Sequence, residues 1–443
     1  MIMLKTLSVA VAIGSSILLT APASGPFQVY HQNPDISASI PVCYTKKGCV
    51  FRTIFGEEAS PMGHIYNTPE NIQESIERGL SWMAAAQLSG GGWGAGSHYN
   101  QSSLDPHAVN ADPATTAMVG MAFLRTGNNL QSGPYSKQLN NALEYLLKAV
   151  ESTPQNQLKI TTEINTQIQT KLGENIDAVL ALQFFSNIAE ELNENDPYMP
   201  RVRRCMNICA NKIQQLQDQD GSFKGAGWAG VLQSSLANNA LEAAEHQGAD
   251  IDEVVLEKSR TYQKGNFNVA SGDVNTEKGA GIVLYAVSGS VRASAKEARK
   301  VREEMDKAVK EGKLKSDEPV SAENLAKLGY SEAEAQKYST AYQVYESAKE
   351  TAQDDRVIRG FGNNGGEEFL SYLQTGESLI INQDQEWEKW YDNVSGRLVT
   401  IQNEDGSWNG HHCITSPVFC TATTLLTLSI NNDVEKLTAL GKR

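Results

Sequence analysis

The stretch Gln402-Asn-Glu-Asp-Gly-Ser-Trp408, with Thr415-Ser-Pro-Val-Phe-Cys-Thr-Ala422 behind it, decides the fold of this chain. Asp405-Gly406 predicts a tight turn, because glycine tolerates positive φ. Ser416 is placed to cap a helix, and Pro417 follows at the first helical position, where a missing N–H costs nothing. We therefore interpret the stretch as the middle of a helical hairpin, with Trp408 folded back over the turn.

The same turn occurs twice more, as Gln87-Leu-Ser-Gly-Gly-Gly-Trp93 and as Gln217-Asp-Gln-Asp-Gly-Ser-Phe223. In each copy five residues that include glycine separate a glutamine from an aromatic residue. Three matches at one internal spacing indicate an internal repeat. An amphipathic pattern precedes the turn, as in residues 71–87, and an Ala-, Thr- and Leu-rich helix is expected after it, in residues 112–124, 234–244 and 416–430.

Degenerate copies fill the intervals between the clear ones. Residues 139–150 pair with 175–189, residues 254–263 pair with 279–287, and residues 369–380 form a further helix. The total is about six hairpins, a number that closes a double ring of helices if each helix buries one face against its neighbours. We expect an all-α fold, an α/α toroid over residues 69–430.

The turn, followed by a helix that begins near Pro and runs Thr-Ala-x-x-x-x-Leu, resembles the repeat of the squalene and hopene cyclases and of the protein prenyltransferase β subunits. The resemblance covers most of the chain after the N-terminal segments. It implies an α/α toroid with a central cavity. Because the motif residues tie hairpins together, the resemblance speaks for the fold more than for an activity.

Charge and the N-terminal residues limit the class of protein. A formal net charge of -14 argues against nucleic acid as a partner. Residues 1–23 have the pattern of a secretory signal peptide, with an uncleaved anchor as the alternative, and residues 24–68 are expected to form an irregular arm. No later apolar run is long enough to span a membrane, so we expect an exported, periplasmic or extracellular protein.

Residues 291–355 hold 12 Lys or Arg and 14 Asp or Glu, about twice the charged fraction of the whole chain. We interpret this segment as a charged helical insertion on the rim of the toroid. It is either a solvated excursion or an arm that docks a protein partner. Residues 431–443 are expected to form a C-terminal tail.

The first turn and its surroundings supply candidate residues for chemistry. Asp112, in Asn110-Ala-Asp-Pro-Ala-Thr-Thr-Ala117, is similar in place to the cyclases' acid motif but lacks the neighbouring carboxylates, and an ordinary N-cap is the alternative. His98 and His107, with Asp105 between them, could supply a metal or acid/base site. The aromatic residues of the turns and loops are candidates for ligand binding: Trp93, Tyr99, Trp228 and Trp408.

The last hairpin carries residues that the other copies lack. His411, His412 and Cys413, with Cys420 beyond them, are similar in place to the zinc site of the prenyltransferases, and His and Cys are good zinc ligands. A Cys413–Cys420 disulfide is the alternative. A third reading is a reactive Cys420 at a helix N-terminus, with His412 as its base. Cys43 with Cys49 and Cys205 with Cys209 are further disulfide candidates, since export favours bridges.

Three functions remain open from the sequence. The first is an exported repeat protein that binds an apolar or extended ligand, such as an isoprenoid or a peptide, in or on the toroid. The second is an enzyme of the toroid class, either an isoprenoid cyclase or transferase, or a polysaccharide lyase or glycosidase acting on a glycan. The third is an interaction scaffold that acts through residues 291–355.

Overall fold

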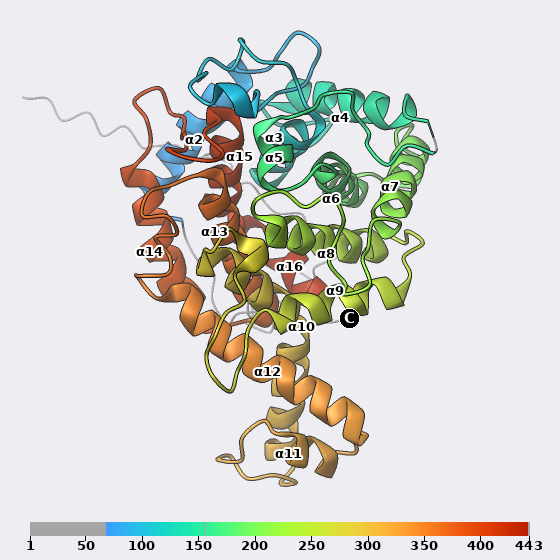
Figure 1. Ribbon diagram of the computed structural model, residues 1–443, viewed down its shortest axis with the longest axis vertical. Helices are drawn as coiled ribbons and strands as arrows, with labels where there is room; N and C mark the ends of the chain where they lie inside the picture. Colours follow the sequence, from blue (N-terminus) through green and yellow to red (C-terminus); the bar gives the residue numbers. More distant parts are fainter. Residues whose placement is uncertain (1–67, 155, 442–443) are drawn as a thin grey trace, which may run out of the picture. The chain divides into compact units, whose positions relative to one another are not determined.

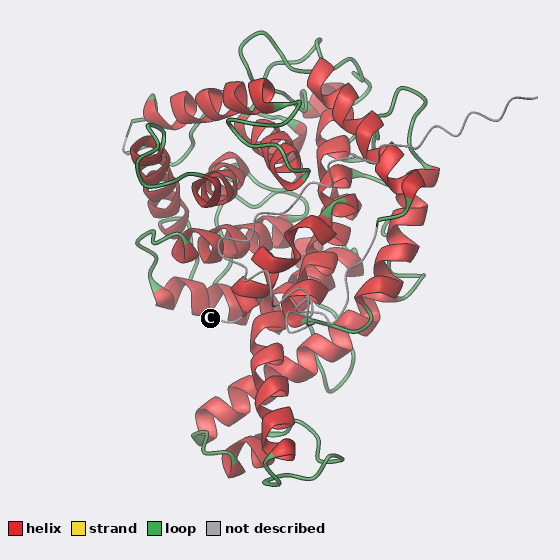
Figure 2. Ribbon diagram, turned by 180° about the vertical axis from the view of Figure 1, so that it is seen from behind, coloured by secondary structure: helices red, strands yellow, loops and turns green. Residues whose placement is uncertain are grey.

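The structure, a computed structural model, describes residues 68–154 and 156–441, all within one compact unit (Figure 1). The expected signal peptide, nearly all of the expected arm, and Cys43 and Cys49 lie outside the described residues. The described part is all-α: helices and loops make it up, and its extended pairings are isolated bridges, not strands (Figure 2). This confirms the expected all-α class. Within these residues no helix is both long enough and apolar enough to cross a bilayer.

The described chain has six pairs of helices, each with a first and a second helix. Five follow the predicted hairpins, whereas the first helix of the fifth pair falls in the predicted charged insertion. The pairs are α2 (Glu70–Ala85) with α3 (Pro113–Arg125), α4 (Ser136–Glu151) with α6 (Ile176–Glu191), α7 (Met199–Gln214) with α8 (Gly230–His246), α9 (Glu253–Gly265) with α10 (Val283–Lys310), α12 (Glu332–Gln353) with α13 (Gly366–Asn382), and α14 (Trp387–Thr400) with α15 (Pro417–Leu428). The second helices are buried on almost all sides, whereas the first helices bury one face.

The second helices contact one another in a closed series. The order of contacts is α3, α6, α8, α10, α13 and α15, and α15 returns to α3. The first helices pack on the outside of this series, α4 against α3 and α7, for example, and α14 against α13 and α2 (Figure 1). Shorter elements complete the described chain: η1 (His98–Asn100), α5 (Gln167–Lys171), η2 (Glu277–Gly279), α11 (Ala322–Lys327), η3 (Ile430–Asp433) and α16 (Val434–Gly441).

The aromatic residue of each turn is part of the hairpin itself. The indole N–H groups of Trp93 and Trp408 donate to the carbonyls of Met83 and Leu398, at 2.9 and 2.7 Å. The Trp408 amide also donates to the hydroxyl of Thr421, on the following helix. Both rings are fully buried. The prediction that Trp93 and Trp408 bind a ligand is therefore wrong, because these rings join the two helices of their own hairpins.

The glutamine of each turn reaches the next hairpin. The Gln87 amide donates to the Gln138 carbonyl at 3.0 Å, and the Gln217 amide donates to the Val255 carbonyl at 2.7 Å. In the last copy the Gln402 amide donates to the Ser75 carbonyl, in the first described helix, at 2.9 Å. One recurring hydrogen bond thus connects successive hairpins and also joins the last hairpin to the first.

The charged segment does not begin where its composition changes. Position 291 falls inside α10, whose residues up to Arg299 are almost all buried among the second helices. Only the end of α10, α11 and the start of α12 extend away from the other helices (Figure 1). They have a small core of their own, formed by Val301, Met305, Ala308, Leu314, Leu325 and Ala335. A charge count misplaces the boundary because it averages over the apolar face of α10.

The expected C-terminal tail is also different in the structure. Residues 434–441 form α16, which packs against α13 and α10. Its Leu437 is buried, and Leu440 packs against the main core. The segment is too short to show a helical period by itself, but its apolar residues complete the core at this end of the second helices.

We expect Gly406→Ala to destabilise the fold, because Gly406 has a φ of 95° and an added Cβ would lie 2.7 Å from the Arg78 carbonyl oxygen. The expected loss in the free energy of unfolding is at least about 1 kcal/mol, measured by urea denaturation. Gly396→Ala is the matched control, since Gly396 lies on exposed α14 surface with nothing within 4 Å of a new Cβ. That control should gain about 0.5–1 kcal/mol. Equal stability of the two variants would show that the turn does not need its glycine.

Candidate metal centre

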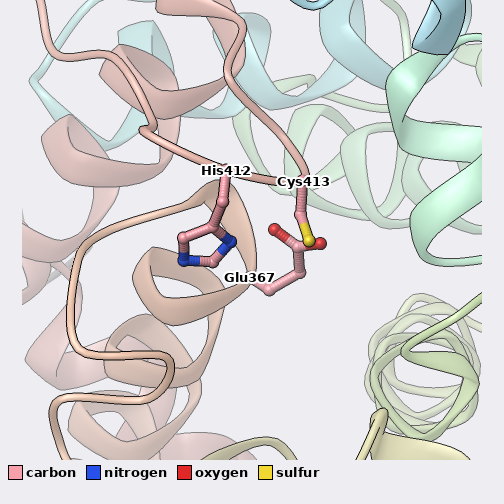
Figure 3. A group of neighbouring side chains, drawn as sticks. All are labelled: Glu367, His412 and Cys413. Atoms are coloured by element: carbon pink, nitrogen blue, oxygen red, sulfur yellow. The ribbon is translucent and has the colours of Figure 1, made fainter.

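The start of α13 meets the loop that precedes α15 at a cluster of three side chains. Glu367 lies in the first turn of α13, and His412 and Cys413 lie in the loop (Figure 3). One ligand atom from each residue lies within 4.8 Å of the other two. A carboxylate oxygen, an imidazole nitrogen and a thiol sulfur are the donor atoms that hold Zn²⁺ in proteins. We call these three residues the metal centre.

The ring of His412 is oriented for coordination. Its Nε2 lies 2.9 Å from the backbone carbonyl oxygen of Asn363. Because a carbonyl oxygen only accepts, Nε2 carries a proton, and in the neutral ring the lone pair is on Nδ1. Nδ1 is buried without a hydrogen-bond partner, and this edge of the ring faces Glu367 and Cys413 (Figure 3).

A second carboxylate supports the histidine from behind. Glu368 is fully buried and accepts a hydrogen bond from the Tyr285 hydroxyl at 2.6 Å and from the Gly365 amide at 2.9 Å. It also accepts from the Phe361 amide at 3.3 Å and lies 3.4 Å from His412 Nε2. Metal-binding histidines in proteins commonly have such a carboxylate or carbonyl on the ring nitrogen that faces away from the metal. Asn363 and Glu368 occupy that position here.

Negative charge on the Glu367 carboxyl and the Cys413 thiol is unfavourable in the metal centre. Burial, reinforced by Glu368, raises the pKa of Glu367 to about 8. Burial, reinforced by Glu367, raises the pKa of the Cys413 thiol to about 11. Both groups therefore hold protons near neutral pH when no cation is present. A divalent cation would reverse this preference, since it favours the carboxylate and the thiolate.

Residues from other hairpins hold the loop in place. The Gln101 side chain donates to the Cys413 backbone carbonyl oxygen at 2.8 Å. The side-chain oxygen of Gln167 accepts from the Thr415 backbone amide at 2.7 Å. Cys413 itself has a φ of 56°, a left-handed conformation that is uncommon for a residue with a side chain. The metal centre is thus fixed by three segments that are far apart in the sequence.

Three exposed aromatic residues, which we call the aromatic trio, are connected to the metal centre directly or through neighbouring residues. Phe361 packs edge-on against His412, with 4.9 Å between ring centroids. Tyr99 is 81% exposed and lies beside His98. Trp228 is 64% exposed and has the Lys171 ammonium 4.2 Å above its ring. Tyr99 and Trp228 were predicted to bind a ligand, and both remain open to solvent for that role.

Other predicted site residues do not come together. His107 is exposed, and its backbone amide donates to Asp105 in a local turn. His98 accepts a hydrogen bond from Gln101, and burial lowers its pKa. Within the part of the chain that the structure describes, these residues form no metal-binding group. The prediction of a metal site at His98 and His107 is therefore wrong, because these side chains do not come together with a third ligand.

Asp112 is the N-cap of α3, as the structural alternative predicted. It accepts from the Thr115 amide at 2.7 Å and from the Ala95 amide at 2.8 Å. The sequence analysis found no carboxylate beside it, but Asp177 is a neighbour in space. Burial first, and then the charge of Asp177, raise the pKa of Asp112. Asp177 accepts hydrogen bonds from the Ala114 amide and the Gln169 side chain. The pair of carboxyl groups therefore stabilises the N-terminal ends of α3 and α6.

The described cysteines are free thiols. Cys205 and Cys209 lie one turn apart on α7, and both are buried without a bridge. Cys413 and Cys420 are likewise unbridged. Both predicted disulfides are therefore wrong. The Cys413 thiol interacts with Glu367, and the Cys420 thiol donates to the Ile414 carbonyl oxygen at 3.5 Å, so each thiol is held in its own contact.

The reading of Cys420 as a reactive thiolate is also wrong. Complete burial raises the pKa of this thiol well above its ordinary value, which outweighs the helix dipole. Of the three predicted zinc ligands, His411 is exposed, and only His412 and Cys413 belong to the metal centre. Glu367 was not among the predicted candidate ligands. Its signal was a pair of carboxylates placed directly after two glycines at the start of an otherwise apolar helix.

Comparisons with known proteins found no match to any family model, any curated protein or any solved structure. The function therefore has to be argued from the chemistry of the metal centre and its surroundings.

We expect the contribution of Asp112 and Asp177 to the stability of the chain to fall as the pH rises from about 4 to about 7. Their raised pKa values mean that the native state binds more protons than the unfolded state above the ordinary aspartate pKa of about 3.9. Their stabilising contribution is therefore complete at low pH and is lost as the pH passes the raised values. Asp112→Asn should flatten this decline, measured by urea denaturation across the pH range.

Asp105→Asn is the control, since Asp105 also accepts from a backbone amide but is exposed. It should follow the wild-type pH curve. A curve for Asp112→Asn parallel to the wild type would contradict the raised pKa of Asp112.

Proposed function

We propose that the chain forms an α/α toroid of the kind that the cyclase and prenyltransferase repeat implies. The closed series of contacts among the six second helices supports an inner ring, and the first helices packed outside it support an outer one. The Gln402 amide supports closure, because it bonds the last hairpin to the first. Export from the cytoplasm remains part of this proposal and depends on residues 1–23.

Within this toroid, we propose that Glu367, His412 and Cys413 bind one Zn²⁺ ion. The observation that carries the proposal is the buried, unpartnered Nδ1 of His412, which faces the Glu367 carboxyl and the Cys413 thiol. A buried acceptor without a partner is costly, about 1–3 kcal/mol, unless something binds to it. The mixture of nitrogen, sulfur and oxygen donors favours zinc over calcium or magnesium, which prefer oxygen alone.

Three protein ligands leave one tetrahedral position for water or substrate, which is the arrangement of catalytic zinc sites. When bound there, zinc supplies a Lewis acid and lowers the pKa of a bound water or thiol. Glu368 and Tyr285 keep the His412 ring in place, and Asn363 fixes its tautomer. We therefore propose a metal-dependent enzyme of the toroid class, which hydrolyses its ligand or transfers a group to it.

The aromatic trio indicates the kind of ligand. Exposed rings on loops around a site offer flat apolar faces with polar edges, which suit a peptide or a glycan lying across them. A fully apolar isoprenoid would instead be expected to enter a closed apolar pocket. We propose that an extended ligand lies across Tyr99, Trp228 and Phe361 and reaches the metal centre from the solvent side.

The zinc proposal predicts one Zn²⁺ per chain, measured by competition with a chromophoric chelator. Glu367→Gln, His412→Ala and Cys413→Ser should each weaken binding at least about tenfold. His411→Ala is the matched control, since His411 is the exposed neighbour of His412 and lies outside the metal centre. Affinity should rise with pH near neutrality, because Glu367 and Cys413 must lose protons to bind the metal.

Substitution with Co²⁺ gives a second readout, since a cysteine ligand produces a thiolate-to-cobalt charge-transfer band that Cys413→Ser should abolish. If His412→Ala and His411→Ala bind zinc equally well, the metal centre is not a metal site.

Trp228 offers a direct assay for the extended ligand. Of the six tryptophans, Trp228 is the most exposed, Trp82 is half-buried and the other four are buried, so a change in fluorescence on ligand binding should come mainly from Trp228. We expect soluble oligosaccharides or unstructured peptides to change this fluorescence, and Tyr99→Ala to weaken their binding several-fold without changing zinc affinity. Trp228→Phe removes the signal and serves as the control. Failure of both panels to bind would leave the aromatic trio without a ligand role and reject this part of the proposal.

A further inference from the structure

A second site lies between the six second helices, away from the metal centre. It is a chamber with a cavity volume of ≈ 90 Å³, partly open to solvent. Each of the six helices contributes to its wall. The apolar part of the wall includes Met118, Met121, Leu180, Leu236, Leu373 and Leu426. An apolar chamber with a few polar groups is the usual form of a small-molecule site.

The chamber is separate from the metal centre along α13. Gln374, which lines the chamber, lies two helical turns beyond Glu367, a rise of about 10 Å. No metal-centre residue lines the chamber. A ligand in the chamber would therefore be held by a different set of side chains from a ligand at the aromatic trio.

Two buried hydrogen-bond donors in the chamber wall lack partners. The amide nitrogen of Gln374 has none, although its carbonyl oxygen accepts from the Ser235 hydroxyl. The Nε of Arg292 also has none. Gln374 is 1% exposed and Arg292 is 4% exposed. Because a buried donor without an acceptor costs about 1–3 kcal/mol, these two N–H groups call for an acceptor inside the chamber.

The charge around Arg292 favours an anionic acceptor. Arg292 donates to the Glu242 carboxylate at 3.0 Å, but the same carboxylate also accepts from Arg260 at 2.8 Å. One buried carboxylate therefore serves two guanidinium groups, and Arg260 has a further, exposed partner in Glu253 at 3.6 Å. The third chamber residue with an unpartnered atom is Asn239, whose side-chain oxygen is an acceptor and suits a hydroxyl or a water beside the anion.

The other charged residues of the chamber are already paired. Arg125 forms ion pairs with Glu377 at 2.7 Å and with Asp433 at 2.6 Å. Lys436 pairs with Glu191 at 2.8 Å. These groups do not compete for a ligand's head group. The unsatisfied polar atoms and the extra positive charge thus fall on the same part of the wall.

We infer that the chamber binds a small monocarboxylic acid with a hydrocarbon chain. The carboxylate accepts from the Nε of Arg292 and the amide nitrogen of Gln374, and the chain lies against the methionine and leucine side chains. The carboxylate of this ligand supplies an acceptor for the two unpartnered donors, and its hydrocarbon chain fills the apolar part of the chamber.

The experiment uses the full chain with a metal chelator present, so that its result does not depend on the zinc proposal. Isothermal titration calorimetry with octanoate, 1-octanol and octylammonium compares three head groups on one hydrocarbon chain. We expect octanoate to bind, octanol to bind at least tenfold more weakly, and octylammonium to show no binding. Equal binding of octanoate and octanol would overturn the assignment of the donors, and no binding of any probe would overturn the site.

Gln374→Leu tests the donor directly. It should weaken octanoate binding at least fivefold and leave octanol binding unchanged. Because it removes the unpartnered amide nitrogen but also the oxygen that accepts from Ser235, urea denaturation checks that the variant is folded. Gln183→Leu is the matched control: Gln183 lines the same chamber, but its amide already donates to Asn187 at 3.1 Å. Octanoate affinity should be unchanged in that variant. An equal loss in both variants would show that the chamber does not recognise a carboxylate through Gln374.

Discussion

The hydrogen bond from the Gln402 amide to the Ser75 carbonyl joins residues 327 positions apart, and the arrangement of the helices depends on it and its two counterparts. Bringing the ends of a long chain together costs conformational entropy, which local turns alone do not offset. The same amide also donates to the Gly406 carbonyl oxygen, within its own turn, at 2.8 Å. One side chain therefore fixes both the turn and its neighbour.

These hydrogen bonds between hairpins also explain why polar side chains lie together at one end of the second helices. Each hairpin turn is followed by a loop and then by the N-terminus of a second helix. The hydrogen bonds between hairpins therefore place these N-termini at the same end. Glu367 and Glu368 at the start of α13 thereby come beside the loop that precedes α15. Carboxylates are tolerated in a first helical turn because the unpaired N–H groups and the helix dipole favour negative charge.

The sequence predicts the fold further than it predicts the site, and particular residues show why. Gln87, Gln217 and Gln402 stand in a local pattern that repeats, so the hairpins could be recognised from spacing alone. Glu367 and His412 belong to different hairpins, and Asp177 is distant from Asp112 in the chain, so no local pattern links them. Trp93 and Trp408 misled the prediction, since a buried structural indole and an exposed binding one look alike in sequence.

The buried carboxyl groups of Asp112 and Glu367 differ in how well hydrogen bonds compensate for their burial. Asp112 accepts from two amides and from the Thr115 hydroxyl, all within 2.9 Å, so its burial is compensated by hydrogen bonds. Glu367 accepts from the Ile414 amide at the longer distance of 3.3 Å, next to a second buried carboxylate. Burying such a group without a strong partner reduces stability. A bound cation would supply the missing partner for Glu367, for Cys413 and for the free nitrogen of His412 together.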